Sequence, residues 1–170
     1  MKKLSLVAFT LLSTMSAGYV SAAEGGVVRF NGTVIDAPCS LAAESDDQTV
    51  PMGDISILSL TAGTTSTESF QVKLENCVAD TKKIAISFNG NTGATNTDLL
   101  GVTGFASGVG IELLNMDKGA SPIPVNAAAE IATEVLAGDH VFNFGARLVA
   151  DGTPAPGDFT AETNFILSYL

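Results

Sequence analysis

The sequence predicts an all-β domain, an antiparallel sandwich of the immunoglobulin type. Short apolar stretches rich in β-branched and aromatic residues recur along the chain, and most of them alternate apolar with polar positions. Clusters of Gly, Asn, Asp, Ser and Thr separate these stretches, as turns separate strands. About seven such stretches are typical of this fold, and the sequence contains no repeat, linker or second domain.

The first 22 residues have the three-part pattern of a secretory signal peptide, with cleavage expected after Ala22 or Ala23. Two lysines form its basic start, and the apolar run at residues 4–12 is too short to cross a bilayer. No later run is long and apolar enough for a transmembrane helix. We therefore expect a secreted protein without membrane insertion.

Removal of this leader leaves six basic residues against 18 acidic ones, a net charge of −12. Such a surface repels nucleic acid phosphates and anionic lipids, so neither is an expected partner. The acidic residues are scattered along the chain, which is typical of a solubilising surface.

Seven stretches are expected to be strands. In order they are RFNGTVIDA, QTVPM, SFQVKLENC, KIAISFNG, GVGIELLN, HVFNFGARLVA and NFILSYL. The stretch PVNAAAEIATEVLAG fits either a short helix or a loop followed by a strand.

The end of the chain alternates with a period of two over about eleven residues. One face of this strand carries Phe159, Ala161, Thr163, Phe165, Leu167 and Tyr169. The other face is polar apart from Ile166. The chain is therefore expected to end within a half-buried strand.

The segment from about Glu24 to Gly32 also alternates, but no hairpin turn follows that would fold it back onto its own chain. An unpaired strand of this kind is an aggregation hazard unless it has a dedicated acceptor. Addition to the sheet edge of another protein is one use for it. An ordinary first strand within its own sheet remains the alternative, because alternation does not say which sheet a strand joins.

Two cysteines, Cys39 and Cys77, occur in a chain expected to reach an oxidising compartment. One disulfide bond is the expected state. Closing a loop of this length stabilises the folded state by roughly 4 kcal/mol on the chain-entropy estimate.

Neither a catalytic site nor a metal or cofactor site is expected. The only histidine, His140, is interpreted as structural, and no G-x-S-x-G stretch accompanies it. Asp46 and Asp47 lie in a stretch typical of a solvated turn. NMDKGAS lacks the ligand set of a calcium loop, and the sequon at Asn31 is interpreted as chance.

Three motifs carry a resemblance to a known family. FNGTVIDAPCS leads into the first cysteine, SFQVKLENC surrounds the second, and NFILSYL ends the chain, with Gly157 fourteenth from the end. In this order and spacing they resemble the major-type pilin subunits of chaperone–usher fimbriae, similar to P-pilus and type 1 rod subunits. The resemblance covers essentially the whole chain after the leader.

The resemblance implies an incomplete immunoglobulin-like sandwich that lacks its last strand, leaving a groove in the core. A periplasmic chaperone fills this groove first, and at an outer-membrane usher the N-terminal extension of the next subunit replaces it. The domains would then be a signal peptide at 1–22, a donor-strand extension at 23–32 and a pilin domain at 33–170. The protein would reach the cell surface through the periplasm, as part of a fimbria that supports adhesion.

Residue roles follow from the same resemblance. The extension's pocket positions match Gly26, Val28, Phe30 and Gly32, with Gly26 where exchange starts and Ala23 or Glu24 at the most distal pocket. The strand that pairs with the chaperone contains Phe165, Leu167 and Tyr169. The partners would be further copies of this chain or sibling pilins.

Other functions remain open. A minor adaptor or a chain-terminating subunit shares the same fold. A tip adhesin needs a separate receptor domain, for which this chain lacks the length, and a secreted enzyme needs a nucleophile–base pair or metal cluster that the sequence does not offer.

Overall fold

The computed structural model describes residues 26–34, 37–63, 65–80, 82–128 and 133–170. The expected leader, its cleavage positions and the distal-pocket candidates Ala23 and Glu24 lie outside these ranges. A compact unit comprises residues 35–170, and the described residues before it, 26–34, are treated separately. Within the described part of the chain, no helix has both the length and the apolar character needed to cross a membrane.

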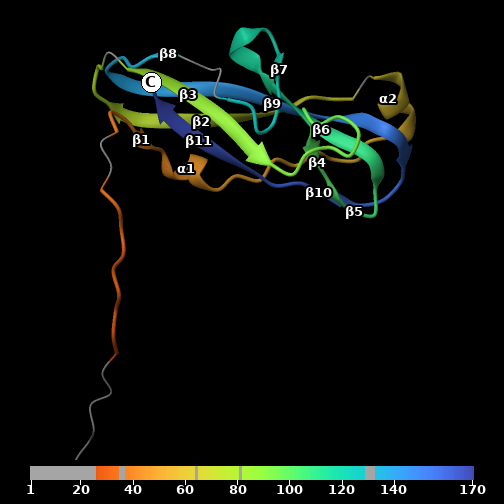
Figure 1. Cartoon of the computed structure of the whole chain (residues 1–170), viewed down its shortest axis with the longest axis horizontal. Helices are drawn as coiled ribbons and strands as arrows, with labels where there is room; N and C mark the ends of the chain where they lie inside the picture. The colour runs from red at the N-terminus through yellow and green to blue at the C-terminus, as the bar shows by residue number, and fades with distance from the viewer. Residues whose placement is uncertain (1–25, 35–36, 64, 81, 129–132) are drawn as a thin grey trace, which may run out of the picture. The chain divides into compact units, whose positions relative to one another are not determined.

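The larger sheet of the compact unit is antiparallel throughout. Its strand order is β1 (Ser40–Leu41), β2 (Glu68–Cys77), β9 (Gly138–Ala155), β6 (Ser107–Asn115) and β4 (Leu100–Gly101), with β7 (Ser121–Ile123) also paired to β6. The 18-residue strand β9 pairs with β2 along its first half and with β6 along its second half. One long strand therefore joins the two halves of this sheet (Figure 1).

The smaller sheet has the order β11 (Thr163–Tyr169), β3 (Lys83–Gly90) and β8 (Thr133–Glu134). A separate two-stranded pair joins β10 (Phe159–Thr160) to β5 (Thr103–Gly104). In Figure 1, β3 and β11 cross in front of β2 and β9. The architecture is the expected antiparallel sandwich of immunoglobulin type.

An aromatic cluster joins the two sheets. Phe70 of β2 and Phe144 of β9 stack with ring centroids 5.4 Å apart. Phe88 of β3 contacts both rings edge-on, at 6.1 Å from Phe70 and 5.0 Å from Phe144. Phe88 and Phe144 are 2% and 1% exposed, which places this cluster at the centre of the core.

Five of the expected strands are confirmed, as β2, β3, β6, β9 and β11. The expectation of a strand at QTVPM is wrong, since the chain there runs without strand pairing and turns at Gly53, whose φ is +66°. The described residues of RFNGTVIDA are not in a strand either. For the stretch PVNAAAEIATEVLAG, the sequence allowed either a short helix or a loop followed by a strand. Its described residues form a loop followed by the short strand β8.

Three short helical turns were not expected: α1 (Ala43–Asp46), α2 (Ile57–Ala62) and the 3-10 turn η1 (Met116–Lys118). The signals for α2 are in the sequence. Ser56 accepts a hydrogen bond from the Ser59 backbone N–H and caps the helix start, and Gly63 ends the helix in the left-handed conformation. Only six residues lie between these caps, too few for an apolar periodicity to be visible.

Candidate functional site

An open groove of about 1080 Å³ runs between β11 and the chain segment at residues 45–57. Its floor is apolar and comes from the inner faces of three strands of the larger sheet. The floor residues are Phe70 and Val72 of β2, Val109, Ile111 and Leu113 of β6, and Ala146 and Leu148 of β9. These side chains belong to the hydrophobic core, so the groove opens into the interior of the sandwich.

Strand β11 forms one wall. It pairs with β3 in an unbroken register from Thr163 opposite Gly90 to Tyr169 opposite Ile84, and within the described sheet it has no second neighbour. An edge strand of this kind presents a row of unpaired backbone N–H and C=O groups. The wall therefore offers a hydrogen-bonding ladder beside an apolar floor.

The side chains of β11 alternate as the sequence predicted, but the expected strand of about eleven residues is interrupted at Ala161 and Glu162, which separate β10 from β11. Phe165 and Leu167 are half-buried and line the groove, whereas Ile166 is 51% exposed on the other face. Tyr169 is also half-buried and packs against the core, and this burial raises the pKa of its hydroxyl above the usual value. Phe165, Leu167 and Tyr169, three of the six residues expected on one face, thus all lie on the inner side of this strand.

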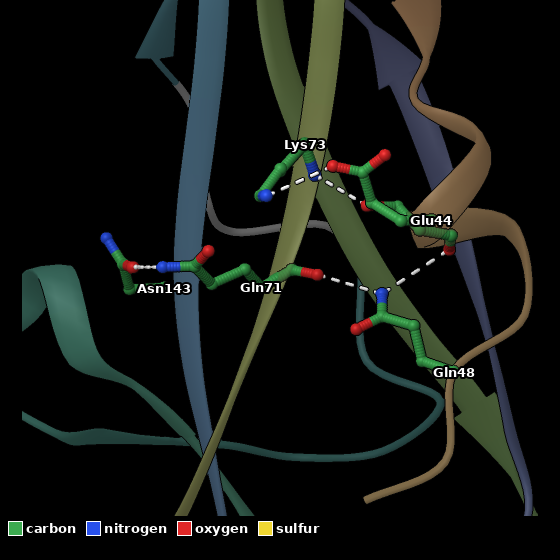
Figure 2. A network of polar contacts seen from close by, with 6 residues as sticks. Glu44, Gln48, Gln71, Lys73 and Asn143 are labelled. Carbon is green, nitrogen blue, oxygen red and sulfur yellow. Dashed lines mark hydrogen bonds and ion pairs between the residues drawn. The ribbon is translucent and has the colours of Figure 1, made fainter.

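The opposite wall is the segment after α1, where Val50, Met52 and Ile55 border the groove. This wall is tied to the neighbouring edge of β2 by side chains rather than by a strand ladder. The Gln48 amide donates to the backbone carbonyl of Gln71 at 2.8 Å, and the Lys73 backbone N–H donates to the Ser45 hydroxyl at 2.9 Å. Figure 2 shows the bond from Gln48 to Gln71.

The same region carries a network of polar side chains on the outer face of the sheet. Lys73 Nζ lies 3.1 Å from Glu44 Oε1, and this hydrogen bond with the ammonium lowers the pKa of the Glu44 carboxyl (Figure 2). The Gln71 amide donates to Asn143 Oδ1 at 2.8 Å. The roles of Ser45 and Gln48 carried no signal in the sequence, where their stretch fits a solvated turn.

The N-terminal segment at residues 26–34, here called the arm, is exposed along its whole length. Val28 and Phe30 are 74% and 90% exposed, and the open space around Gly26 and Gly32 leaves nothing within 4 Å of an added Cβ. None of its residues is in a strand. The arm therefore presents large apolar side chains to solvent.

A disulfide bond closes the start of the compact unit. Cys39 and Cys77 are joined with Cα atoms 4.1 Å apart, across a sequence separation of 38 residues. The Val78 backbone N–H donates to the Pro38 carbonyl at 2.8 Å, beside the bond. The chain that follows the arm is thereby attached to the end of β2, as the two cysteines predicted.

The remaining candidates have ordinary structural surroundings. His140 Nε2 lies 2.9 Å from the Leu136 carbonyl, next to the start of β9. Asp46 and Asp47 are both exposed. Among the described residues, no group of three His, Cys, Asp or Glu side chains is placed to hold a metal ion.

Comparison with known proteins gives consistent matches. The family model described as "Fimbrial protein" matches residues 28–170. The chain is 40% identical to the Fimbria A protein of Serratia marcescens and 34% identical to the Major MR/P fimbria protein of Proteus mirabilis. The first alignment covers 99% of both chains, and the second 99% of this chain and 98% of the relative. A solved chaperone–usher pilus superposes with a TM-score of 0.71 at 25% identity, over 94% of this chain and 100% of that one.

Proposed function

Because the chain belongs to the fimbrial protein family and is a structural subunit of a surface fimbria, we propose that its copies join by donor-strand exchange. In this reaction the arm of one subunit enters the groove of the next. It then adds to the free edge of β11 as the missing strand. Once inserted, it completes the hydrogen-bonding ladder and covers the apolar floor.

The observation that carries this proposal is the coexistence of two complementary features in one chain. The groove exposes core side chains and an unpaired strand edge, and both are costly to leave uncovered. The arm exposes alternate apolar side chains and a backbone without strand partners. Each feature supplies what the other lacks.

The alternation of the arm sets which side chains enter the groove. Gly26, Val28, Phe30 and Gly32 share one face of an extended chain and would point at the floor, and Arg29 and Asn31 would point to solvent. Burial of Val28 and Phe30 contributes roughly 1.5–3 kcal/mol each. The glycines let the arm backbone approach the groove closely. Ala23 or Glu24 fills the most distal pocket.

Repetition of this contact makes a filament. The arm and the groove are different surfaces of the same chain, so the contact is heterologous and does not close on itself. Each added subunit offers a new free end of the same kind. Further copies of this chain, or sibling pilins with the same two features, are therefore the partners.

Before assembly the groove needs a temporary occupant. We assign this role to a periplasmic chaperone that pairs with β11 through Phe165, Leu167 and Tyr169. Removal of the chaperone from the groove is assigned to an outer-membrane usher. The leader at residues 1–22 would direct the chain to the periplasm. The assembled fimbria at the cell surface supports adhesion.

The experiment that tests the proposal deletes most of the arm together with Glu24 and Gly25 before it. A variant lacking residues 24–32, produced in cells without the intact protein, is expected to form a chaperone complex but no fibres. A matched control variant with Arg29 and Asn31 both changed to Ser keeps the groove-facing side chains and is expected to assemble. Fibre assembly by the arm-deleted variant, scored by electron microscopy, contradicts the proposal.

A further inference from the structure

One large aromatic side chain, Phe105, is 87% exposed in the turn between β5 and β6. Its position is nonetheless closely held. The Phe105 and Ala106 backbone N–H groups both donate to the Asp158 carbonyl, at 2.9 and 3.1 Å. A Cβ at Gly157 would overlap the backbone of this turn, so only glycine fits beneath it. The ring is thus displayed to solvent from a rigid support.

A second exposed apolar patch lies near the start of the compact unit, beside the disulfide bond. Val78 is 69% exposed and Leu136 is 61% exposed, and the half-buried Pro38 lies beside Val78 through the hydrogen bond described above. The Asp80 backbone N–H donates to the Val135 carbonyl at 3.2 Å, which brings the segments of Val78 and Leu136 together. We call Pro38, Val78 and Leu136 the root patch.

Phe105 and the root patch lie at opposite ends of the compact unit. The start of β11 lies next to β10, which pairs with β5 immediately before Phe105. The end of β11 lies beside Lys83, whose strand partner Glu134 is close in sequence to Leu136. Figure 1 shows β5 and β8 at the two ends of the sandwich.

The direction of an inserted arm decides which of these ends meet. Every strand pair among the described residues is antiparallel. An arm added antiparallel to β11 places Gly26 near Tyr169 and Gly32 near Thr163. Five residues then separate Gly32 from Pro38, a reach of at most about 20 Å. The root patch of the donor subunit must therefore lie close to the Phe105 end of the acceptor.

We infer that Phe105 of one subunit packs against the root patch of the subunit whose arm it receives. The inference rests on the proposed donor-strand contact and adds a second surface to it. The groove lining extends through residues 155–164 to Ala106, next to Phe105. The surface around Phe105 is therefore continuous with the groove that receives the arm. Contact between them removes exposed apolar area on both sides and sets the orientation of successive subunits.

Engineered cysteines test this contact directly. Fibres are assembled from the Phe105→Cys/Leu136→Cys variant, oxidised, dissociated and separated without reductant. A ladder of covalent multimers is expected. The control variant Ile166→Cys/Leu136→Cys instead places a cysteine in the middle of β11, on its outer face, where the replaced side chain is 51% exposed. This control is expected to give only monomers after dissociation. Normal fibres without a ladder from the Phe105 variant would overturn the inference and leave the arm proposal standing.

A pair of charged substitutions provides an independent measurement. Phe105→Glu is expected to give fewer and shorter fibres, because a carboxylate would face the apolar root patch. Adding Leu136→Lys in the same chain is expected to restore the number and length of the fibres, because the ammonium can pair with the new carboxylate. If Phe105 instead contacted a chaperone or usher, Leu136→Lys would not restore the fibres. Phe105→Glu fibres equal to the unmodified ones in number and length would also overturn the inference. Failure of donor-strand exchange itself is recognised separately, by fibre assembly without the arm.

Discussion

Phe88 of β3 meets Phe144 of β9 edge to face, with ring centroids 5.0 Å apart and ring planes at 83°. This contact joins the smaller sheet, which carries β11, to the larger sheet that forms the groove floor. Phe88 itself lines the groove. The geometry of the acceptor site thus depends on the packing between the sheets.

Replacing Phe144 by alanine is expected to destabilise the compact unit by about 3–5 kcal/mol, because the side chain is fully buried and its neighbours would border a cavity. Urea unfolding of the purified subunit measures this loss. The control Ile166→Ala removes a side chain that is 51% exposed and is expected to cost much less. Equal losses for the two variants would refute the role assigned to this contact.

The disulfide bond is expected to stabilise the subunit by roughly 4 kcal/mol, through the smaller entropy of an unfolded chain with a closed loop. Changing both Cys39 and Cys77 to Ser removes the bond without leaving a free thiol. The variant and the unmodified protein are compared by thermal unfolding at one pH. A midpoint that does not fall would contradict the estimate.

Asp151 is a buried carboxylate, 5% exposed, that organises the turn at residues 93–98. Burial opposes its ionisation, but the backbone N–H groups of Thr95 and Asn96 donate to it at 3.1 and 2.7 Å. Together with the Ala94 N–H, they hold its pKa below the usual value. Asp151→Ala is expected to cost about 1.5–3 kcal/mol, the contribution of hydrogen bonds to a charged group.

The pH dependence follows from the direction of this shift. A carboxyl group whose pKa is lower in the folded state stabilises the fold above its unfolded pKa, and the contribution is lost as the pH falls through the folded pKa. Asp151→Asn is therefore expected to flatten the loss of stability in acid below about pH 4. Asp98→Asn, an exposed change in the same turn, serves as the control. An unchanged acid profile for Asp151→Asn would contradict this account.

Within the arm, Phe30 and Arg29 are adjacent but are expected to point in opposite directions once the arm is inserted. Phe30→Ala should weaken the contact between subunits by roughly 1.5–3 kcal/mol of lost burial. Arg29→Ala should have little effect. The temperature at which purified fibres dissociate in detergent measures both. The opposite order of effects would mean that the register of the arm is shifted by one residue.

The same logic applies to β11. Phe165 faces the groove, whereas Ile166 is on the outer face. Phe165→Ser is expected to reduce recovery of the chaperone complex from the periplasm, and Ile166→Ser to leave it nearly unchanged. Co-purification with a tagged chaperone gives the comparison, and equal recovery for both variants would exclude a specific role for the inner face.

Much of the sandwich was predictable because its strands alternate along the chain. β2, β3, β6, β9 and β11 each carry a local period of two, and the two cysteines indicated their own bond. The stretch QTVPM has the composition of a strand but does not form one. At Gly53 the chain turns away, and Gln48 satisfies the β2 edge with a side-chain amide instead. Composition does not reveal that a side-chain amide, rather than the backbone of a neighbouring strand, bonds to this edge.

The sequence by itself determined five of the strands, the disulfide bond and the apolar alternation of the arm, since each depends on neighbouring residues or on residue type alone. The tertiary structure decided three other features. Ser45 and Gln48 complete the edge of β2, Asp151 organises a distant turn, and the groove stays open beside β11. Each depends on residues far apart in the chain, whose proximity arises only when the two sheets pack.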